Sequence, residues 1–263
     1  MPPRKRTRSY DSAKIRAAVL AQYAQVREAV AGLDAERLAA DSALGGWAVR
    51  DLVAHIAIGV QSVSRGVQRP APAKAEHTAL DFPFLTAPFA EVVAEGSRAL
   101  ALAEADLVTF GKAVADRVAK DLAKAPDERV IDARFGSITL GDFLVTRTLE
   151  LAVHTDDLNR STGLAIPIER EVLAASTRLL ADALAVKAPG GAVEVRVPPF
   201  AVVQCVEGPR HTRGTPPNVV EMSPLTFIRL ATGRTDWATA LDAAQVSASG
   251  ERADLSELLP LMG

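Results

Sequence analysis

The spacing of apolar side chains changes along the chain, and this change constrains the fold more than any other feature of the sequence. From Ser12 to about Leu33 apolar residues recur every three or four positions, which is typical of a helix with one buried face. From Val193 to Val197 they alternate with charged residues, which is typical of a half-buried strand. We therefore expect a helical first part and a second part that combines strands with helices.

Four long helices are expected in the first part, residues 12–165, and their connections predict an antiparallel four-helix bundle. Between the second and third helices lies a proline-rich segment, Arg69 to Pro88, which we interpret as an ordered loop over the bundle. The fourth helix should end before Gly163, because glycine is a favoured residue just past a helix. The expected helices run from Ser12 to about Leu33, from Val49 to about Ser64, from Phe89 to Lys120 in one piece or two, and from Thr139 to Gly163.

The second part, residues 166–263, is predicted to be a small α/β domain. A helix is expected after Pro167, and Ser223 followed by Pro224 is a typical helix start. The boundary between the two parts lies near residues 163–167. The remaining expected elements are strands at Val193–Val197, Phe200–Val206, Val219–Met222 and near Val246, and a last helix from Ser256.

Composition narrows the class of protein. The net charge is -2, which gives no general attraction to nucleic acid or to acidic membranes. Residues 1–11 carry a basic cluster and are interpreted as a disordered tail. No apolar stretch approaches the roughly 20 residues that a membrane helix needs. The single cysteine, Cys205, excludes an intramolecular disulfide, and its apolar surroundings favour a small buried side chain over a reactive thiol. The simplest location is the cytoplasm.

One pair of polar residues in the fourth helix indicates a metal site. Glu150 and His154 are four residues apart, so a helix places them on one face within reach of the same ion. Asp157 follows on the same side, where it either orients the His154 ring or binds the metal itself. Their apolar neighbours predict a buried helix, and an ionised glutamate there is costly unless it is paired or bound to metal.

His55 supplies a third candidate ligand from the second helix, among apolar neighbours. Two imidazoles and one carboxylate suit zinc or another first-row divalent ion, and three protein ligands leave room for water or substrate. The alternative is that these are hydrogen-bonded core residues that meet no ion, because such pairs often arise by chance. His77, in the proline-rich loop, and His211 are both expected to be exposed.

The segments Gly46–His55 and Glu150–Leu158 together resemble the mycothiol-dependent maleylpyruvate isomerase family. The resemblance covers roughly residues 12–163 and implies a DinB-like four-helix bundle. It also implies that His55, Glu150 and His154 are the metal ligands. The implied cosubstrate is mycothiol, a low-molecular-weight thiol. From the donor set, we expect the divalent metal cofactor to be Zn²⁺.

Residues beyond 165 are similar to the sterol-carrier-like domain that often follows such bundles, through the segments Asn218–Glu221, Ser223–Phe227 and Ala231–Arg234. The resemblance implies that an arginine of this domain assists the active site, and Arg234 is the candidate. The alternative is that Arg234 only interacts favourably with the negative end of a helix.

Three functions remain open at this stage. The first is an isomerase or thiol S-transferase in which a metal-activated mycothiol adds to a small electrophile. The second is a binding protein without catalysis, in which the sterol-carrier-like domain shelters a lipid or another apolar ligand. Its lining would come from Val193, Val195, Val197, Phe200, Val202, Val203 and Trp237, which otherwise form a filled core. The third is a bundle that keeps its ligands but has lost the reaction.

Overall fold

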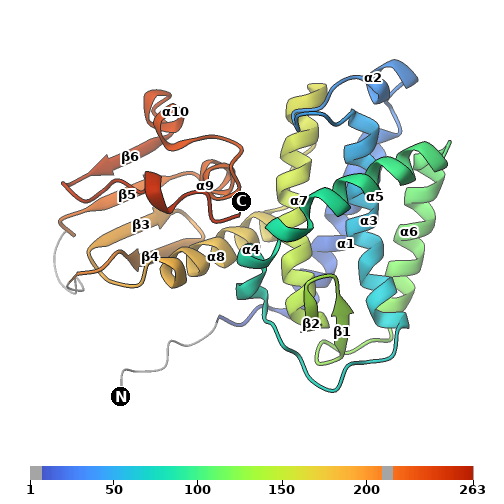
Figure 1. The fold of residues 1–263 in the computed structure, drawn as a ribbon, viewed down its shortest axis with the longest axis horizontal. Coiled ribbons are helices and arrows are strands. Elements are labelled where there is room, and N and C mark those ends of the chain that lie inside the picture. The colour runs from blue at the N-terminus through green and yellow to red at the C-terminus, as the bar shows by residue number, and fades with distance from the viewer. Residues whose placement is uncertain (1–7, 209–215, 263) are drawn as a thin grey trace.

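The computed structural model describes residues 8–208 and 216–262, and it shows a helical bundle beside a smaller sheet domain (Figure 1). This is the fold class that the sequence predicted. The bundle consists of α1 (Ser12–Val30), α3 (Val49–Gln68), α6 (Leu107–Leu122) and α7 (Leu140–Thr162). α1 and α3 each pack against both α6 and α7, so the four helices form a closed ring around one apolar core.

The directions of the four helices differ from a simple antiparallel arrangement. Gln68 at the end of α3 donates a hydrogen bond to Asp121 at the end of α6, so these two helices run the same way. The starts of α1 and α7 both lie against Asp127, through Arg16 and Gly141, so they also run together. The reason is the long connection after α3, which carries the chain back to the end of the bundle where α3 began.

That connection is more ordered than a loop. It contains two short 3₁₀ turns, η1 (Ala79–Asp81) and η2 (Ala87–Phe89), with α4 (Phe82–Leu85) between them, and it continues into α5 (Ala90–Ala103). The helix expected from Phe89 to Lys120 is therefore two helices, α5 and α6. They separate because the Asp106 side chain caps the start of α6 by accepting hydrogen bonds from the backbone of Val108 and Thr109.

Three further elements of the bundle region were not predicted. α2 (Ala35–Ala39) is a single short turn of helix between α1 and α3. β1 (Val130–Ala133) and β2 (Gly136–Thr139) form an antiparallel hairpin between α6 and α7. Ile131 and Ile138 are partners in this hairpin and are fully buried, so it closes one end of the bundle core.

The second domain contains one mixed sheet with the strand order β4-β3-β5-β6. β3 pairs antiparallel with β4 and parallel with β5, and β5 pairs antiparallel with β6. α8 packs against α1 and α7 of the bundle and against β4 and α9 of the domain, so it joins the two parts. The bounds are α8 (Arg170–Lys187), β3 (Val193–Val197), β4 (Ala201–Cys205), β5 (Val219–Met222), α9 (Pro224–Ala231), α10 (Trp237–Asp242), β6 (Val246–Ser249) and η3 (Ser256–Leu258).

Most of these elements confirm the sequence prediction, with two exceptions. α10 was not predicted, and the last helix expected from Ser256 is only the 3₁₀ turn η3. The valines of β3 are fully buried, as alternation predicts, whereas Val202 on β4 is 59% exposed and does not line an interior. Cys205 is buried, and burial raises the pKa of its thiol to about 11, so the thiol stays protonated at neutral pH. Among the described residues no helix is long and apolar enough to cross a membrane.

Gly163 ends α7 in the left-handed region with φ 70°, and a side chain there would be strained. We expect Gly163→Ala to lower the free energy of unfolding by about 1 kcal/mol, measured by urea denaturation. Gly96→Ala is the matched control, because Gly96 lies inside α5 with open space around its α-carbon. That variant should be neutral or stabilising by up to about 1 kcal/mol. Equal effects of the two variants would contradict the assigned cap.

Candidate metal centre

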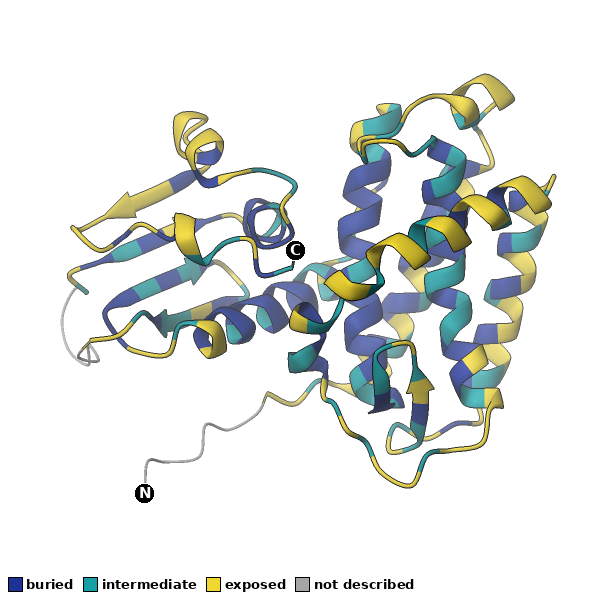
Figure 2. Cartoon of the chain, in the orientation of Figure 1, coloured by how far each residue is buried: buried dark blue, intermediate teal, exposed yellow. Residues whose placement is uncertain are grey.

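The centre lies on α7, which is buried along most of its length (Figure 2). Thr139 caps its start by accepting a hydrogen bond from the Asp142 backbone, and Gly163 ends it. α7 packs against α1 and α3 on one side and against α8 on the other, so few of its faces meet solvent. Any polar side chain on this helix therefore needs a partner inside the protein.

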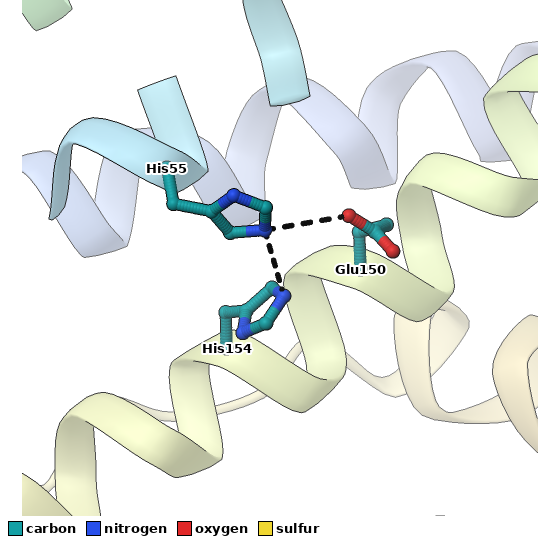
Figure 3. Close-up of side chains that lie close together, drawn as sticks. All are labelled: His55, Glu150 and His154. Atoms are coloured by element: carbon teal, nitrogen blue, oxygen red, sulfur yellow. Dashed lines mark hydrogen bonds and ion pairs between the residues drawn. The ribbon is translucent and has the colours of Figure 1, made fainter. Parts of the chain in front are cut away.

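His55, Glu150 and His154 point toward one another across the interface of α3 and α7 (Figure 3). The Nε2 atoms of the two histidines are 3.0 Å apart, and Nε2 of His55 is 3.7 Å from Oε2 of Glu150. All three ligand atoms lie within 4.8 Å of one another. The structure thus brings together three residues that the sequence placed on two separate helices, and these side chains are 11–20% exposed.

The hydrogen bonds on the far side of each ring decide which nitrogen carries the proton. The Ser97 hydroxyl donates to the Val93 carbonyl at 2.7 Å, so its oxygen is left to accept from Nδ1 of His55 at 3.3 Å. On His154, Nδ1 lies 3.0 Å from the Asp157 carboxylate and donates to it. A neutral ring at either position therefore holds its proton on Nδ1 and turns the lone pair of Nε2 toward the other ring.

Two lone pairs that face each other at 3.0 Å repel unless a cation or a proton lies between them. A shared proton would require one ring to be charged. Burial, and then the nearby His154 ring, lower the pKa of His55. The charged form of the His55 ring is therefore disfavoured. The arrangement of donors is therefore one that a metal ion between the two rings would complete.

Glu150 completes a set of donors with a suitable charge. Burial alone would raise the pKa of its carboxyl, but the Arg147 guanidinium and the two histidines outweigh that effect and hold the pKa well below its usual range. Glu150 is thus ionised at neutral pH. Two imidazole nitrogens and one carboxylate oxygen are a common donor set for zinc and its neighbours.

The size of the site also fits an ion. The cavity that these three side chains line together with Arg147 and apolar neighbours on α3 and α7 measures about 10 Å³, roughly the space of one water-sized sphere. Two nitrogens that share a tetrahedral zinc are roughly 3.3 Å apart, so the rings would separate by a few tenths of an ångström. The residues present therefore fit a divalent ion with little rearrangement.

Asp157 links the centre to the second domain. Its carboxylate is fully buried and accepts from Nδ1 of His154, while Arg234 donates to both of its oxygens at 3.3 and 3.0 Å. Burial alone would raise the pKa of Asp157, but the bonds from His154 and Arg234 lower it to about 2. Because Asp157 holds the nitrogen that faces away from His55, the geometry supports an orienting role for it.

Arg234 thus contacts the candidate ligands indirectly, through Asp157, and is not one of them. Its guanidinium also donates to the Thr232 carbonyl at 2.8 Å. A second ion pair of the same kind lies beside it, where Arg229 of α9 donates to both oxygens of Asp156 at 2.8 and 2.5 Å. A direct contact between Arg234 and a substrate stays a prediction.

Several residues of the centre were not anticipated from the sequence. Ser97, Arg147 and the pair of Asp156 and Arg229 had no assigned role. Arg147 carried a usable signal, since it lies among the apolar residues of a helix predicted to be buried. Ser97 had no such signal in the sequence, because an isolated serine in an amphipathic helix is common.

The two remaining histidines lie elsewhere. His77 is half-buried rather than exposed, because its backbone pairs with Ile138 and its ring lies 6.1 Å from the Phe135 ring. His211 lies outside the described residues.

Comparison with known proteins connects this geometry to a family. Residues 19–159 match the sequence model of the mycothiol maleylpyruvate isomerase N-terminal domain, and residues 169–261 match that of the bacterial SCP ortholog. No curated protein gives a significant match.

Two solved structures are similar over almost the whole chain. One is the crystal structure of the mycothiol-dependent maleylpyruvate isomerase, with 17% identity, a TM-score of 0.58 and coverage of 93% of this chain and 95% of that one. The other is a histidine-to-alanine mutant of the mycothiol-dependent maleylpyruvate isomerase, with 16% identity, a TM-score of 0.57 and the same coverage. At this identity the likeness shows a shared fold.

We expect the protein, purified without chelator and supplied with zinc, to hold about one ion per chain. His154→Ala should lose it, because one of three donors is removed. Asp157→Asn should weaken zinc binding by roughly tenfold to a hundredfold, because the ring loses its orienting carboxylate. Metal content by mass spectrometry and a competition titration with a chromogenic chelator measure both effects.

His77→Ala is the control for this measurement, since it removes a histidine outside the centre. It should bind zinc as the unchanged protein does. Equal metal content in the unchanged protein and in His154→Ala would contradict the assigned ligands.

Proposed function

Because the chain belongs to the family of the mycothiol maleylpyruvate isomerase N-terminal domain, which matches residues 19–159 of its 263, we propose that it is a metal- and thiol-dependent enzyme. Its cosubstrate is mycothiol, its second substrate is a small electrophile, and its reaction is an isomerisation or the transfer of the thiol. The metal is Zn²⁺ or a similar divalent ion. The cytoplasm, where low-molecular-weight thiols are kept reduced, is the compartment in which this chemistry fits.

The observation that carries this proposal is the pair of Nε2 lone pairs that face each other beside an ionised carboxylate. A buried group of this kind is unfavourable by itself and becomes favourable around a cation. The similarity of fold over both domains is consistent with it, since the crystal structures that match are of a mycothiol-dependent enzyme.

Each residue of the centre then has a definite task. His55, Glu150 and His154 would hold the ion, and Ser97 and Asp157 keep both histidine rings in the tautomer that can bind it. A divalent ion bound there would lower the pKa of a thiol or a water that it contacts, so that the nucleophile is available near neutral pH. The three protein donors leave positions open for such a ligand.

The chemistry of the thiol explains both candidate outcomes. The thiolate forms a sulfur–carbon bond to one carbon of an activated cis double bond, and the electron pair moves onto the electron-withdrawing group. The former double bond is now single and rotates. If the electron pair returns and the thiolate leaves, the product is the trans isomer. If a proton is added to the carbon instead, the product is the stable thiol conjugate.

A direct test is to incubate the zinc-loaded protein with mycothiol and a panel of small electrophiles that includes activated cis alkenes. Proton NMR follows the cis-to-trans change, and loss of free thiol follows conjugate formation. We expect a rate above that of the metal-free protein for at least one electrophile. Glu150→Gln should fall to the metal-free rate, because the donor charge is removed.

Two outcomes would decide against this proposal. If the zinc-loaded protein and the metal-free protein gave the same rate across the panel, the centre would bind metal without catalysis. If His77→Ala lost activity as Glu150→Gln does, the loss would not report on the centre.

A further inference from the structure

The candidate metal centre is closed to anything larger than an ion. The cavity that His55, Glu150 and His154 help to line measures about 10 Å³, which is too small for a thiol or an electrophile. The side chains of these three residues are 11–20% exposed. One side of the centre must therefore open before either substrate of the proposed reaction can reach the ion.

Several sides of the centre are held firmly. α3 and α7 carry the ligands themselves, and both pack into the core of the bundle. On the side of the second domain, Arg234 and Arg229 bind the carboxylates of Asp157 and Asp156. Separating buried ion pairs leaves uncompensated charges inside the protein, so this side stays closed.

α5 covers a further side and is held by few buried side chains. It crosses α3, against which it packs, on the outside of the bundle (Figure 1). Of its 14 residues, Ser97 and Ala101 are the buried ones, whereas α3 buries half of its 20. Exposed residues run along most of α5 (Figure 2). Because local stability follows the number of buried contacts, α5 is the helix at the centre that opens most easily.

The hydrogen bonds of α5 to its surroundings are also few. Within the described parts of the chain, three of them join α5 to α3 and to the turn before α3. The acceptors are the Ser97 hydroxyl for Nδ1 of His55 at 3.3 Å, the Ala101 carbonyl for Arg50, and the Gly46 carbonyl for Arg98 at 3.4 Å. Each is a single bond, and water can replace it when α5 moves outward.

The chain on both sides of α5 can accommodate such a movement. Phe82 before the helix and Leu107 after it are buried and act as anchors. Within residues 84–106, between these anchors, the buried residues are again Ser97 and Ala101. A short non-helical link separates α5 from α6. α5 can therefore leave α3 as a unit while both anchors stay in place.

We propose that α5 is a movable cover of the metal centre, which leaves α3 to admit the thiol and the electrophile and closes again over His55. This inference rests on the proposed function and adds the conformational step that gives access to its site. Closure is linked to the metal, because Ser97 holds the His55 ring with Nε2 toward the ion when α5 is in place. By reciprocity, a bound ion favours the closed state.

The test is a covalent link that keeps α5 closed. Arg50→Cys and Leu102→Cys place two thiols beside the contact between Arg50 and the end of α5, where Leu102 is 80% exposed. A short bis-maleimide joins the two thiols, and the same double variant capped with a mono-maleimide is the control. Both treatments are applied to one folded protein. Cys205 is buried and does not compete.

The rate at which zinc-loaded protein gives up its ion to an excess of chromogenic chelator measures access to the centre. We expect the linked protein to release zinc about tenfold more slowly than the capped control. Ala101→Gly removes a buried methyl group from the contact with α3 and should release zinc about fourfold faster than the unchanged protein. Ala99→Gly, the same change at an exposed position of α5, should release zinc at the unchanged rate.

Two outcomes overturn the cover. One is an equal rate of zinc release in the linked protein and in the capped control. The other is an equal acceleration in Ala101→Gly and Ala99→Gly, which would mean that the contact with α3 does not hold α5 closed.

A second measurement keeps this inference separate from the proposed function. If the protein takes up no zinc, the proposed function fails, and access is measured on the metal-free protein with diethyl pyrocarbonate, which modifies histidine rings. The link should then slow the modification of His154 and leave that of His77, outside the centre, unchanged. Equal modification of His154 in the linked protein and the capped control overturns the cover by itself.

Discussion

The need to compensate polar groups on one buried helix governs much of this structure. α7 is enclosed by α1, α3 and α8, yet it carries Arg147, Glu150, His154, Asp156 and Asp157. Each of these groups has at least one partner on another element, which limits how those elements are arranged around α7. α3 supplies His55, and the second domain supplies Arg229 and Arg234. The rings of Phe82 and Phe143 support the guanidinium of Arg147.

This compensation also connects the two domains to one site. The Arg234 side chain contacts Asp157, which contacts His154, which faces His55. A continuous series of hydrogen bonds therefore runs from the sheet domain to the candidate metal ligands. Because a buried Asp157 without Arg234 would hold its charge less well, the position of the second domain bears on the orientation of the His154 ring. The sterol-carrier-like domain thus contributes to the centre, whether or not it also binds an apolar ligand.

Much of the fold could be predicted because the apolar patterns of its main helices extend over many residues. The 23 residues of α7 and the 20 of α3 repeat their apolar pattern over several turns. The hairpin of β1 and β2 was missed because four-residue strands show too few alternations. The direction of the helices could not be predicted either, since it depends on how the proline-rich segment and α5 cross the bundle.

The candidate site, like the fold, could be predicted from the sequence only in part. The spacing of Glu150 and His154 predicts that they share a face, because both lie on one helix. That His55 meets them depends on packing between helices. Its apolar neighbours made it a candidate ligand, and the family resemblance then implied the same residue. Ser97 and Arg147 have no such pattern. The contacts of Ser97 depend on which hydroxyl hydrogen is already used, and those of Arg147 depend on how its guanidinium packs. These facts appear only when the side chains are in place.

The central claim is that His55, Glu150 and His154 bind one divalent ion. X-ray absorption spectroscopy of the zinc-loaded protein tests it most directly, because imidazole rings give a characteristic multiple-scattering pattern. We expect a first shell of nitrogen and oxygen at about 2.0–2.1 Å, with two imidazoles that fall to one in His55→Ala. A zinc environment without imidazole scattering, or one that His55→Ala leaves unchanged, would contradict it.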